Sequence, residues 1–302
     1  RDKYDSVLIL IARDCRWYLT DDSLPLLSAE DPSTIRLNES GKPVALVPSN
    51  GHGQVIGLSE NTQSGSVDVI FPVLHGPYGE DGSIQGLAKL ANLPCVGTGI
   101  LGSAVGMDKD VAKRLLRDAG VAVADHAIVR AIEWKKAGER DAILSRITDQ
   151  LGLPLFVKPA NLGSSVGVTK AHDTRELRAA LDLAFEFDTK VLVEESIQGR
   201  EIECSVLGNE EPQASVPGEV VSNAEFYSYD AKYIDENGAA LHVPAELDAP
   251  VQEQIQRTAI ETFQVLECTG MARVDMFLTP DNRIYVNEIN TIPGFTRISM
   301  YP

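Results

Sequence analysis

The sequence has few residues of the kinds that form metal clusters or disulfides. Among its 302 residues are five histidines and four cysteines. The cysteines form no Cys-x-x-Cys pair, and the histidines have no metal-ligand spacing; the cysteines are Cys15, Cys95, Cys204 and Cys268. Scattered thiols of this kind are typical of a reduced, cytosolic protein.

Basic residues are also in deficit, with 27 Lys and Arg against 44 Asp and Glu and a net charge of −17. This balance argues against nucleic acid or an anionic membrane surface as a partner, although it leaves room for a local basic pocket that binds phosphates. No apolar run approaches the ~20 residues that span a bilayer, and the first residues do not form a signal peptide. Both ends are expected to be cuts through a longer protein.

The hydrophobic content of 43% lets a chain of this length bury a substantial core, and two or three domains are expected. In residues 1–98, strands are predicted over 6–11 and 66–74 and a helix over 83–91, while residues 32–65 are polar and irregular. A strand followed by a glycine-rich loop and a helix is typical of a doubly wound parallel sheet.

Beyond residue 98, helices and strands are predicted to alternate. Asp108 can cap a helix over 109–119 that stops at Gly120, and Asp173 or Thr174 can cap another. Pro250 suits the first turn of a third helix. Strands are predicted over 153–158, 164–170, 190–194, 201–207 and 213–221.

The most informative feature is a predicted hairpin near the C-terminus. Strands over 272–278 and 284–290 flank a turn-forming segment, Thr279-Pro-Asp-Asn-Arg283. A turn centred on residues 281–282 would place Asp275 opposite Glu288 and Arg273 opposite Asn290, all on one side. Two opposed carboxylates repel each other, and a divalent cation relieves that conflict, with Asn as a neutral ligand. The alternatives are a solvated hairpin with accidental charges, or an odd-length turn that breaks this register.

A second candidate site is the glycine-bearing loop over 158–167, which joins two predicted strands. Its backbone N–H groups and serine hydroxyls could meet phosphates. It is neither a Walker A loop nor a dinucleotide fingerprint, and an ordinary glycine turn is the alternative. Lys158 ends an apolar strand and is either at an edge or directed at an anion, whereas Lys109 and Lys232, taken singly, would more often be solvated.

Taken together and in this order, the motifs resemble the ATP-grasp superfamily and, within it, the D-alanine–D-alanine ligase family. The resemblance covers nearly the whole chain and is carried by 75–86, 102–109, 156–167, 193–201, 218–219, 226–233, 271–275 and 287–294. It implies an α/β and α+β fold with three domains, at 1–98, 99–193 and 194–302. The first would be the doubly wound parallel domain, and ATP would lie between the other two.

The resemblance also implies nucleotide-binding roles. Lys109 and Lys158 would contact phosphates, and Lys232 would come from a mobile loop that closes over the site. Glu201 would accept the ribose hydroxyls, and Asn287 is a further nucleotide-binding position. Adenine would lie along a segment whose backbone reads its edge: Glu194, Glu195 and Ile197.

The implied metal and substrate positions follow the same motifs. Asp275, Glu288 and Asn290 would hold two Mg²⁺ ions, for which Mn²⁺ can substitute, with Glu288 bridging them. Arg273 would stabilise an oxyanion and His75 would line the first D-alanine site. The remaining positions would order the loops or bind the second D-alanine: Ser164, Ser165, Tyr233, Gly294, Ser299 and Met300.

The implied activity is the ATP-dependent joining of two D-alanines through an acylphosphate, for peptidoglycan synthesis, by a cytoplasmic homodimer. The alternatives are a ligase of the same fold with D-lactate or D-serine as acceptor, and a non-catalytic ATP-grasp module. The family's first strand and its Gly-Gly-x-Ser-x-Glu loop do not occur in this chain, nor does its last helix. Within the shared loops, Pro77-Tyr78 and Leu162 stand where smaller or more polar residues are expected.

Overall fold

The computed structural model describes residues 3–12, 14–20, 41–49, 52–59, 65–136, 138–163, 165–222, 239–295 and 299–302. The chain forms two compact units: residues 1–70 with 86–95, and residues 71–85 with 96–302. We refer to these as unit 1 and unit 2. The predicted division into three domains at residues 98 and 193 stays a prediction.

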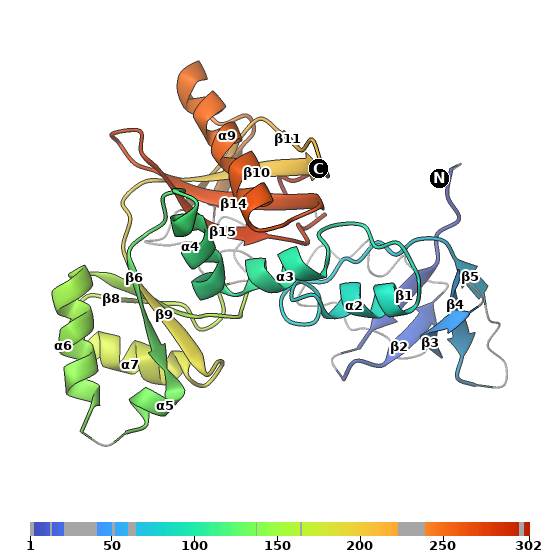
Figure 1. Cartoon of the computed structure of the whole chain (residues 1–302), viewed down its shortest axis with the longest axis horizontal. Helices are drawn as coiled ribbons and strands as arrows, with labels where there is room; N and C mark the ends of the chain where they lie inside the picture. Colours follow the sequence, from blue (N-terminus) through green and yellow to red (C-terminus); the bar gives the residue numbers. More distant parts are fainter. Residues whose placement is uncertain are drawn as a thin grey trace. The chain divides into compact units, whose positions relative to one another are not determined.

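Unit 1 is built on an antiparallel meander of five strands that pair in chain order. Its strands are β1 (Leu8–Ile11), β2 (Trp17–Thr20), β3 (Lys42–Ser49), β4 (His52–Gly57) and β5 (Gly65–Val67) (Figure 1). This arrangement corrects the doubly wound parallel sheet predicted for residues 1–98. Among the described residues of this unit, parallel pairing is confined to the bridge between Ile70 and Cys95. Two strands joined by a short turn, as β1–β2 and β3–β4 are, can pair only antiparallel.

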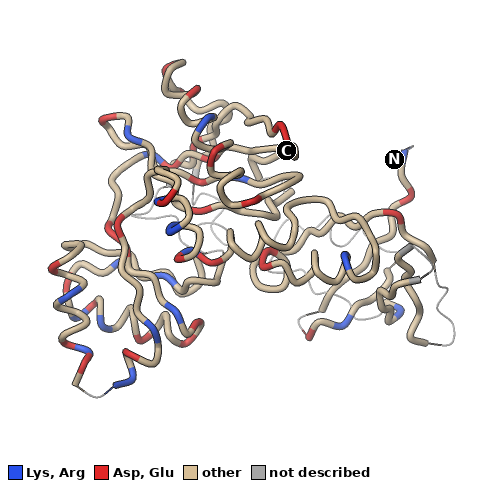
Figure 2. Tube along the Cα trace, in the orientation of Figure 1, with Lys and Arg blue, Asp and Glu red and all other residues tan. Residues whose placement is uncertain are grey.

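Unit 2 contains two separate sheets, each with its own buried cluster. The first has the strand order β6-β9-β7-β8 and is covered by α6 and α7 (Figure 1). Its elements are β6 (His126–Arg130), α5 (Ala131–Trp134), α6 (Arg140–Leu151), β7 (Leu155–Pro159), β8 (Thr169–Ala171), α7 (Thr174–Ala184) and β9 (Lys190–Glu195). Asp173 caps α7 by accepting a hydrogen bond from the Glu176 N–H, as predicted. Basic and acidic residues are interspersed along α6 and α7 (Figure 2).

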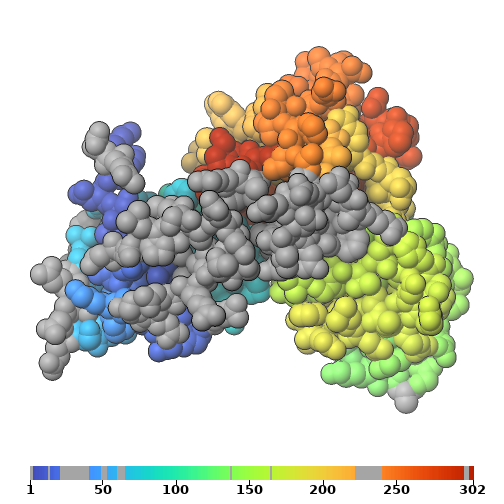
Figure 3. All heavy atoms as spheres, turned by 180° about the vertical axis from the view of Figure 1, so that it is seen from behind, coloured from blue at the N-terminus to red at the C-terminus, as the bar shows by residue number. Residues whose placement is uncertain are grey.

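The second sheet has the order β13-β12-β10-β14-β15, with β11 also paired to β10. Its strands are β10 (Arg200–Gly208), β11 (Gln213–Ala214), β12 (Gly218–Ser222), β13 (Ala239–His242), β14 (Gly270–Leu278) and β15 (Ile284–Asn290). One face packs on α9 (Ala249–Val265), which buries Ile255, Ala259, Thr262 and Phe263 at helical spacing. The opposite side of α9 is exposed in the space-filling view (Figure 3). The other face of this sheet carries the alternate residues of its strands, such as Glu203 of β10 and Arg273 and Asp275 of β14.

Three helices precede β6 in the chain: α2 (Ser83–Leu90), α3 (Ile100–Met107) and α4 (Lys109–Asp118). Asp108 caps α4 by accepting a hydrogen bond from the Val111 N–H. Lys190 of β9 donates to both carboxylate oxygens of Asp108 at 2.6 Å and to Asp110 at 3.1 Å. The Lys109 N–H also donates to the Ala160 carbonyl at 3.0 Å. These bonds fix the start of α4 against the ends of β7 and β9.

We predict that Phe263→Ala lowers the free energy of unfolding of unit 2 by about 3–5 kcal/mol, because the ring is fully buried between α9 and its sheet. Urea unfolding followed by circular dichroism measures this change. Leu207→Ala is the matched control, since Leu207 is 64% exposed and its truncation should change stability by less than about 0.5 kcal/mol. Equal effects of the two substitutions would contradict the assigned core.

Candidate functional site

The predicted hairpin pairing is confirmed, by a route that the sequence did not show. Asp275 pairs with Glu288 and Arg273 with Asn290, but nearer the turn Met276 pairs with Val286. The turn is therefore odd-length, and a β-bulge at Asn287 restores the pairing beyond it. The bulge also turns Glu288 away from the core: Val286 and Ile289 are buried, whereas the intervening Asn287 and Glu288 are both partly exposed.

The bulge places three carboxylates in a row across three strands. Glu203 of β10 pairs with Asp275 of β14, which pairs with Glu288 of β15. Arg273 donates to both oxygens of Asp275 at 2.7 Å and lies 3.2 Å from Glu203. Lys109 of α4 lies 3.2 Å from Glu288. Burial alone would lower the pKa of Arg273, but Asp275 and Glu203 raise it above its usual range, so the guanidinium stays charged.

A second charged group lies on the neighbouring sheet. Lys158 of β7 donates to Glu194 of β9 and, at 3.2 Å, to Asn287 at the bulge. Lys113 of α4 lies 3.1 Å from the other carboxylate oxygen of Glu194. Burial alone would raise the pKa of Glu194, but the charges of Lys113 and Lys158 outweigh it and hold that pKa below its usual range. Lys158 thus joins the two sheets at the predicted phosphate position.

The loop over residues 75–82 contributes a third set of groups. Gly294 lies close to Ser299 and His75. A Cβ atom added to Gly294 would lie 2.6 Å from Ser299 Oγ and 3.6 Å from the imidazole ring of His75. Burial lowers the pKa of His75, and the charge of Arg273 lowers it further, so the ring is neutral near neutral pH. The structure therefore brings together three predicted substrate-binding residues around a position where a side chain would not fit.

Glu80 is a site residue that sequence reasoning missed. Its carboxylate accepts a 2.5 Å hydrogen bond from the Gly76 N–H, and its carbonyl accepts one from Thr291 at 3.2 Å. Burial raises the pKa of Glu80 to about 7, against the lowering effect of the Gly76 N–H. Glu80 lies within the motif at residues 75–86, but the residues around it in the sequence do not indicate that its carboxyl group is buried.

The other predicted residues are placed as follows. Glu195 accepts a hydrogen bond from the Asp125 N–H at 2.8 Å, which anchors the end of β9. Glu201 lies on the same face of β10 as Glu203, opposite Phe277, and Ile197 follows β9. A Cβ on Gly218 would lie 2.7 Å from Met300 Sδ. Ser164, Lys232 and Tyr233 lie outside the described residues.

The donor set fits a hard divalent cation. The Asn290 Oδ1 atom is buried and, among the described residues, has no hydrogen-bond partner. Asn290 pairs with Arg273, and this pair lies beside the pair of Asp275 and Glu288 on the hairpin. Carboxylate and amide oxygens are the ligands that suit Mg²⁺. No group of three His, Cys, Asp or Glu side chains in the described part of the chain is arranged to hold a metal ion. A cation would therefore be held by the amide oxygen of Asn290 and by Asp275 and Glu288. Asp275 would first have to leave Arg273, and Glu288 would have to leave Lys109.

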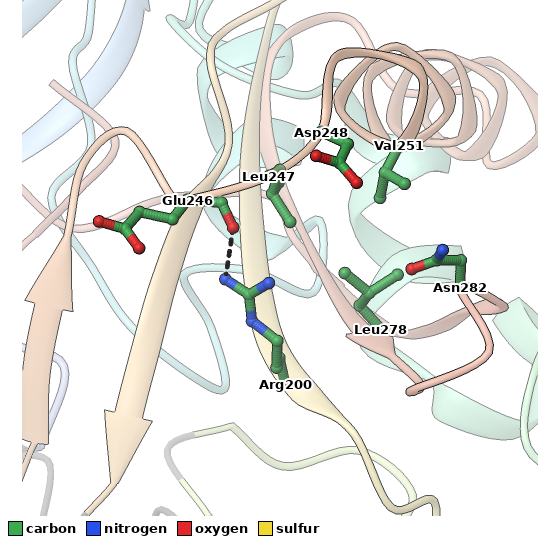
Figure 4. A pocket seen from close by; sticks show the side chains of 7 residues that line it. All are labelled: Arg200, Glu246, Leu247, Asp248, Val251, Leu278 and Asn282. Atoms are coloured by element: carbon green, nitrogen blue, oxygen red, sulfur yellow. Dashed lines mark hydrogen bonds between the residues drawn. The ribbon is translucent and has the colours of Figure 1, made fainter.

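A pocket of about 420 Å³ lies elsewhere in unit 2, near the start of α9 (Figure 4). Arg200 donates to the Glu246 carbonyl at 3.0 Å in its wall, and a bidentate pair with Glu219 at 2.7 Å holds the guanidinium. Its lining is Arg200, Glu246, Leu247, Asp248, Val251, Leu278 and Asn282. None of these is a predicted site residue, so the chemistry is assigned to the charged groups above and not to this pocket.

Comparison with known proteins assigns the family. Residues 1–98 match the family model of the D-ala D-ala ligase N-terminus, and residues 115–302 match that of the D-ala D-ala ligase C-terminus. The D-alanine–D-alanine ligase A of Chromobacterium violaceum is 55% identical over 301 residues, covering 100% of this chain and 81% of the relative.

The chain belongs to the D-alanine–D-alanine ligase family. Two solved structures from the family's fold align with it at 38% identity. The D-alanine–D-alanine ligase of Coxiella burnetii has a TM-score of 0.82 and covers 98% of this chain and 77% of that one. The D-Ala:D-Ser ligase of Enterococcus faecalis has a TM-score of 0.83 and covers 100% and 84%. The ATP-grasp fold predicted from the motifs is confirmed.

Two departures from the family's pattern can be located. The Tyr78 side chain is 66% exposed, and the residue adopts a positive φ of 69° in the turn before α2. The second is Leu162, whose backbone carbonyl accepts a 2.6 Å hydrogen bond from Lys109 Nζ. Because that contact needs no particular side chain, a leucine at this position leaves the lysine's anchor intact. None of the described helices combines the length and apolar character needed to cross a membrane. None of the four cysteines forms a disulfide.

We predict that Glu288→Gln abolishes turnover while leaving the fold intact. The substitution removes one charge of the opposed pair, so any cation held there loses neutralisation and position. Turnover is followed by phosphate release and the fold by circular dichroism. Asp275→Asn should act similarly, with a higher Mg²⁺ requirement. A folded Glu288→Gln protein with near-normal turnover would refute the metal assignment.

Glu80 predicts a pH dependence of stability. Its pKa is about 7 in the folded state against an ordinary value of 4.5, so the folded state holds the proton more tightly than the unfolded state. Stability from this group is complete below pH 4.5 and is lost as the pH rises to about 7. The free energy of unfolding is measured by urea unfolding at intervals from pH 4.5 to about 7, with a chelator present. It should fall less steeply with pH in Glu80→Gln than in the parent protein, by up to about 1.4 kcal/mol per pH unit. Parallel curves would show that Glu80 ionises normally.

Proposed function

We propose that the chain is an ATP-dependent ligase that joins two D-alanines into D-alanyl-D-alanine for peptidoglycan synthesis. Family membership supports the activity, and the row of Glu203, Asp275 and Glu288 with Arg273 and Lys109 supports catalysis by this chain. A non-catalytic module has no chemical need for opposed carboxylates facing buried cations. The 55% identical relative carries the same activity in its name.

The chemistry begins with an unreactive carboxylate. Transfer of the ATP γ-phosphoryl group to the carboxylate oxygen of the first D-alanine gives an acylphosphate and ADP. The amine of the second D-alanine then attacks the carbonyl carbon, and the bond to phosphate breaks. In such reactions the protein acts mainly by positioning and charge neutralisation.

The residues of the site would neutralise phosphate charge, stabilise the oxyanion, hold the amino acid or bind the metal ions, according to where they lie. Lys109 and Lys158 neutralise phosphate charge from two sides, α4 and β7. Arg273 has N–H donors beyond those used by Asp275 and directs them at the oxyanion. His75, Gly294 and Ser299 form the amino-acid cradle. Two Mg²⁺ ions, for which Mn²⁺ substitutes, would be held by Asp275, Glu288 and Asn290, and they supply charge neutralisation at the transferred phosphoryl group.

The acceptor is the finer part of this proposal, because fold similarity does not decide it. A D-Ala:D-Ser ligase and a D-alanine–D-alanine ligase align with the chain at the same identity and with nearly equal TM-scores. We propose D-alanine because the 55% identical relative is a D-alanine–D-alanine ligase. The family resemblance adds a tyrosine, Tyr233, that depsipeptide-forming relatives lack. We also propose a cytoplasmic homodimer. Cysteines that form no disulfide favour the cytoplasm, and the family resemblance favours the homodimer.

The decisive test is phosphate release by the full-length protein with ATP and Mg²⁺, supplied with D-alanine, L-alanine or no amino acid. We expect phosphate to be released in the presence of D-alanine, but not with L-alanine or without an amino acid. A competition among D-alanine, D-lactate and D-serine near neutral pH, analysed by mass spectrometry, should give D-alanyl-D-alanine as the main product. A preference for D-serine or D-lactate would overturn the acceptor, whereas equal release without amino acid would overturn ligase activity.

A further inference from the structure

Lys190 is a buried cation that the proposed mechanism does not use. It is the first residue of β9, and its side chain is only 11% exposed. Its ammonium group donates to both carboxylate oxygens of Asp108 at 2.6 Å and to one oxygen of Asp110 at 3.1 Å. An ammonium group has three N–H donors, and three carboxylate oxygens accept from this one. The donors of Lys190 are therefore committed to the protein and not to a ligand.

The two acids that Lys190 holds lie at the start of α4, on either side of Lys109. Asp108 caps this helix by accepting a hydrogen bond from the Val111 N–H at 3.1 Å, and Asp110 lies in its first turn. Their side chains are largely buried, at 17% and 6% exposed. The helix dipole favours acids at this end and disfavours a lysine. The two acids, and not the helix, therefore account for the position of Lys190.

Lys190 also holds Lys109 through the backbone. The Ala160 N–H donates to the Lys190 carbonyl at 3.0 Å, and the Ala160 carbonyl accepts a bond from the Lys109 N–H, also at 3.0 Å. Ala160 directly follows β7 and begins the glycine-bearing loop. Two connections, one through the backbone and one through side chains, therefore join the first residue of β9 to the first residue of α4.

The side chain of Lys109 leaves this junction in a different direction. Successive residues of a helix point about 100° apart, so the acids can face β9 while Lys109 faces the proposed phosphate position. Its Nζ donates to the Leu162 carbonyl at 2.6 Å and lies 3.2 Å from Glu288. The reach of Lys109 is therefore set by where α4 begins, and a shift of about 1 Å at that end would disturb its hydrogen bonds.

We propose that Lys190 is a positioning residue for phosphate binding: by holding Asp108 and Asp110, it fixes the start of α4 so that Lys109 reaches the phosphates of the nucleotide. This inference rests on the proposed use of ATP and of Lys109. Lys190 does not touch the nucleotide. Without it, Asp108 would lose this cation and Asp110 would keep the exposed Arg114. The start of α4 would then move so that water could reach these acids, and Lys109 would move with it.

The test measures binding of the β,γ-imido analogue of ATP, with Mg²⁺, to the full-length protein by calorimetry. Lys190→Met should weaken binding by about ten- to hundredfold, the range for one hydrogen bond to a charged group. Lys190→Arg keeps the charge and should recover most of the affinity. The matched control is Arg114→Met, which removes the other cation on Asp110, one whose side chain is 61% exposed. This control should bind the analogue as tightly as the parent protein does.

A double-variant cycle separates positioning from general support of the fold. If Lys190 acts through Lys109, its loss matters only while Lys109 is present. In the background of Lys109→Met, adding Lys190→Met should therefore change the affinity by less than about twofold. If the losses of the two single variants multiply instead, Lys190 supports the site independently of Lys109, and the proposal is overturned.

Should Lys190→Met fail to fold, Asp108→Asn breaks the charge pair and keeps the cap of α4, because asparagine caps helices as well as aspartate does. We expect Asp108→Asn to weaken binding by about two- to tenfold, again only where Lys109 is present. Unchanged affinity in the folded variant would overturn the proposal. A parent protein that does not bind the analogue would instead overturn the use of ATP, and a Lys109→Met variant that binds as the parent does would overturn the phosphate role of Lys109.

Discussion

Carboxylates paired with cations organise unit 2. Glu194 is held by Lys113 and Lys158, Glu288 by Lys109, and Asp275 by Arg273. Unpaired, the buried Glu194 would cost several kcal/mol in a low-dielectric interior, and the two partly exposed acids would cost less. The Lys113–Glu194 and Lys109–Glu288 pairs join α4 to β9 and to β15, whereas Lys158 and Glu194 lie on neighbouring strands of one sheet and Arg273 and Asp275 on one strand. The two pairs made by α4 therefore form only when that helix is packed against both sheets.

In the mechanism that we propose, the same pairs would prepare the site for its substrates. Cations that neutralise protein carboxylates in the absence of ligand can be redirected to phosphates, and carboxylates released in that exchange can bind metal ions. Lys190, by contrast, bonds Asp108 and Asp110 at the start of α4, away from this exchange. It can therefore keep α4 in place while Lys109 and Lys158 change partners. A fixed scaffold next to exchangeable pairs is the arrangement that phosphoryl transfer requires.

The sequence predicts the site residues better than it predicts their surroundings. Asp275, Glu288 and Asn290 were selected by strand alternation together with an assumed turn at residues 281–282, and the structure reaches the same pairing through a bulge at Asn287. Residues 42–57 looked irregular because Pro43 and Pro48 interrupt an otherwise apolar run, yet they form β3 and β4. Strand direction in unit 1 was wrong because alternation does not encode which neighbour a strand pairs with. Lys113 was missed because burial of a charge depends on partners distant in the chain, and Glu194 is 81 positions after it. Glu80 was missed although its carboxylate is bonded by the nearby Gly76 N–H, because its burial depends on tertiary packing; Thr291, which bonds its carbonyl, is 211 positions away.

The bulge at Asn287 separates two parts of the hairpin. The pairs nearest the turn follow one register and those at the site follow another, with the extra residue between them. The turn at residues 279–283 can therefore be exchanged for a different loop without moving Asp275 or Glu288, provided the bulge is kept. This makes the tip of the hairpin a natural insertion point for a reporter peptide or a purification handle, and it makes deletion of one residue at position 287 far more damaging than deletion of one at the tip.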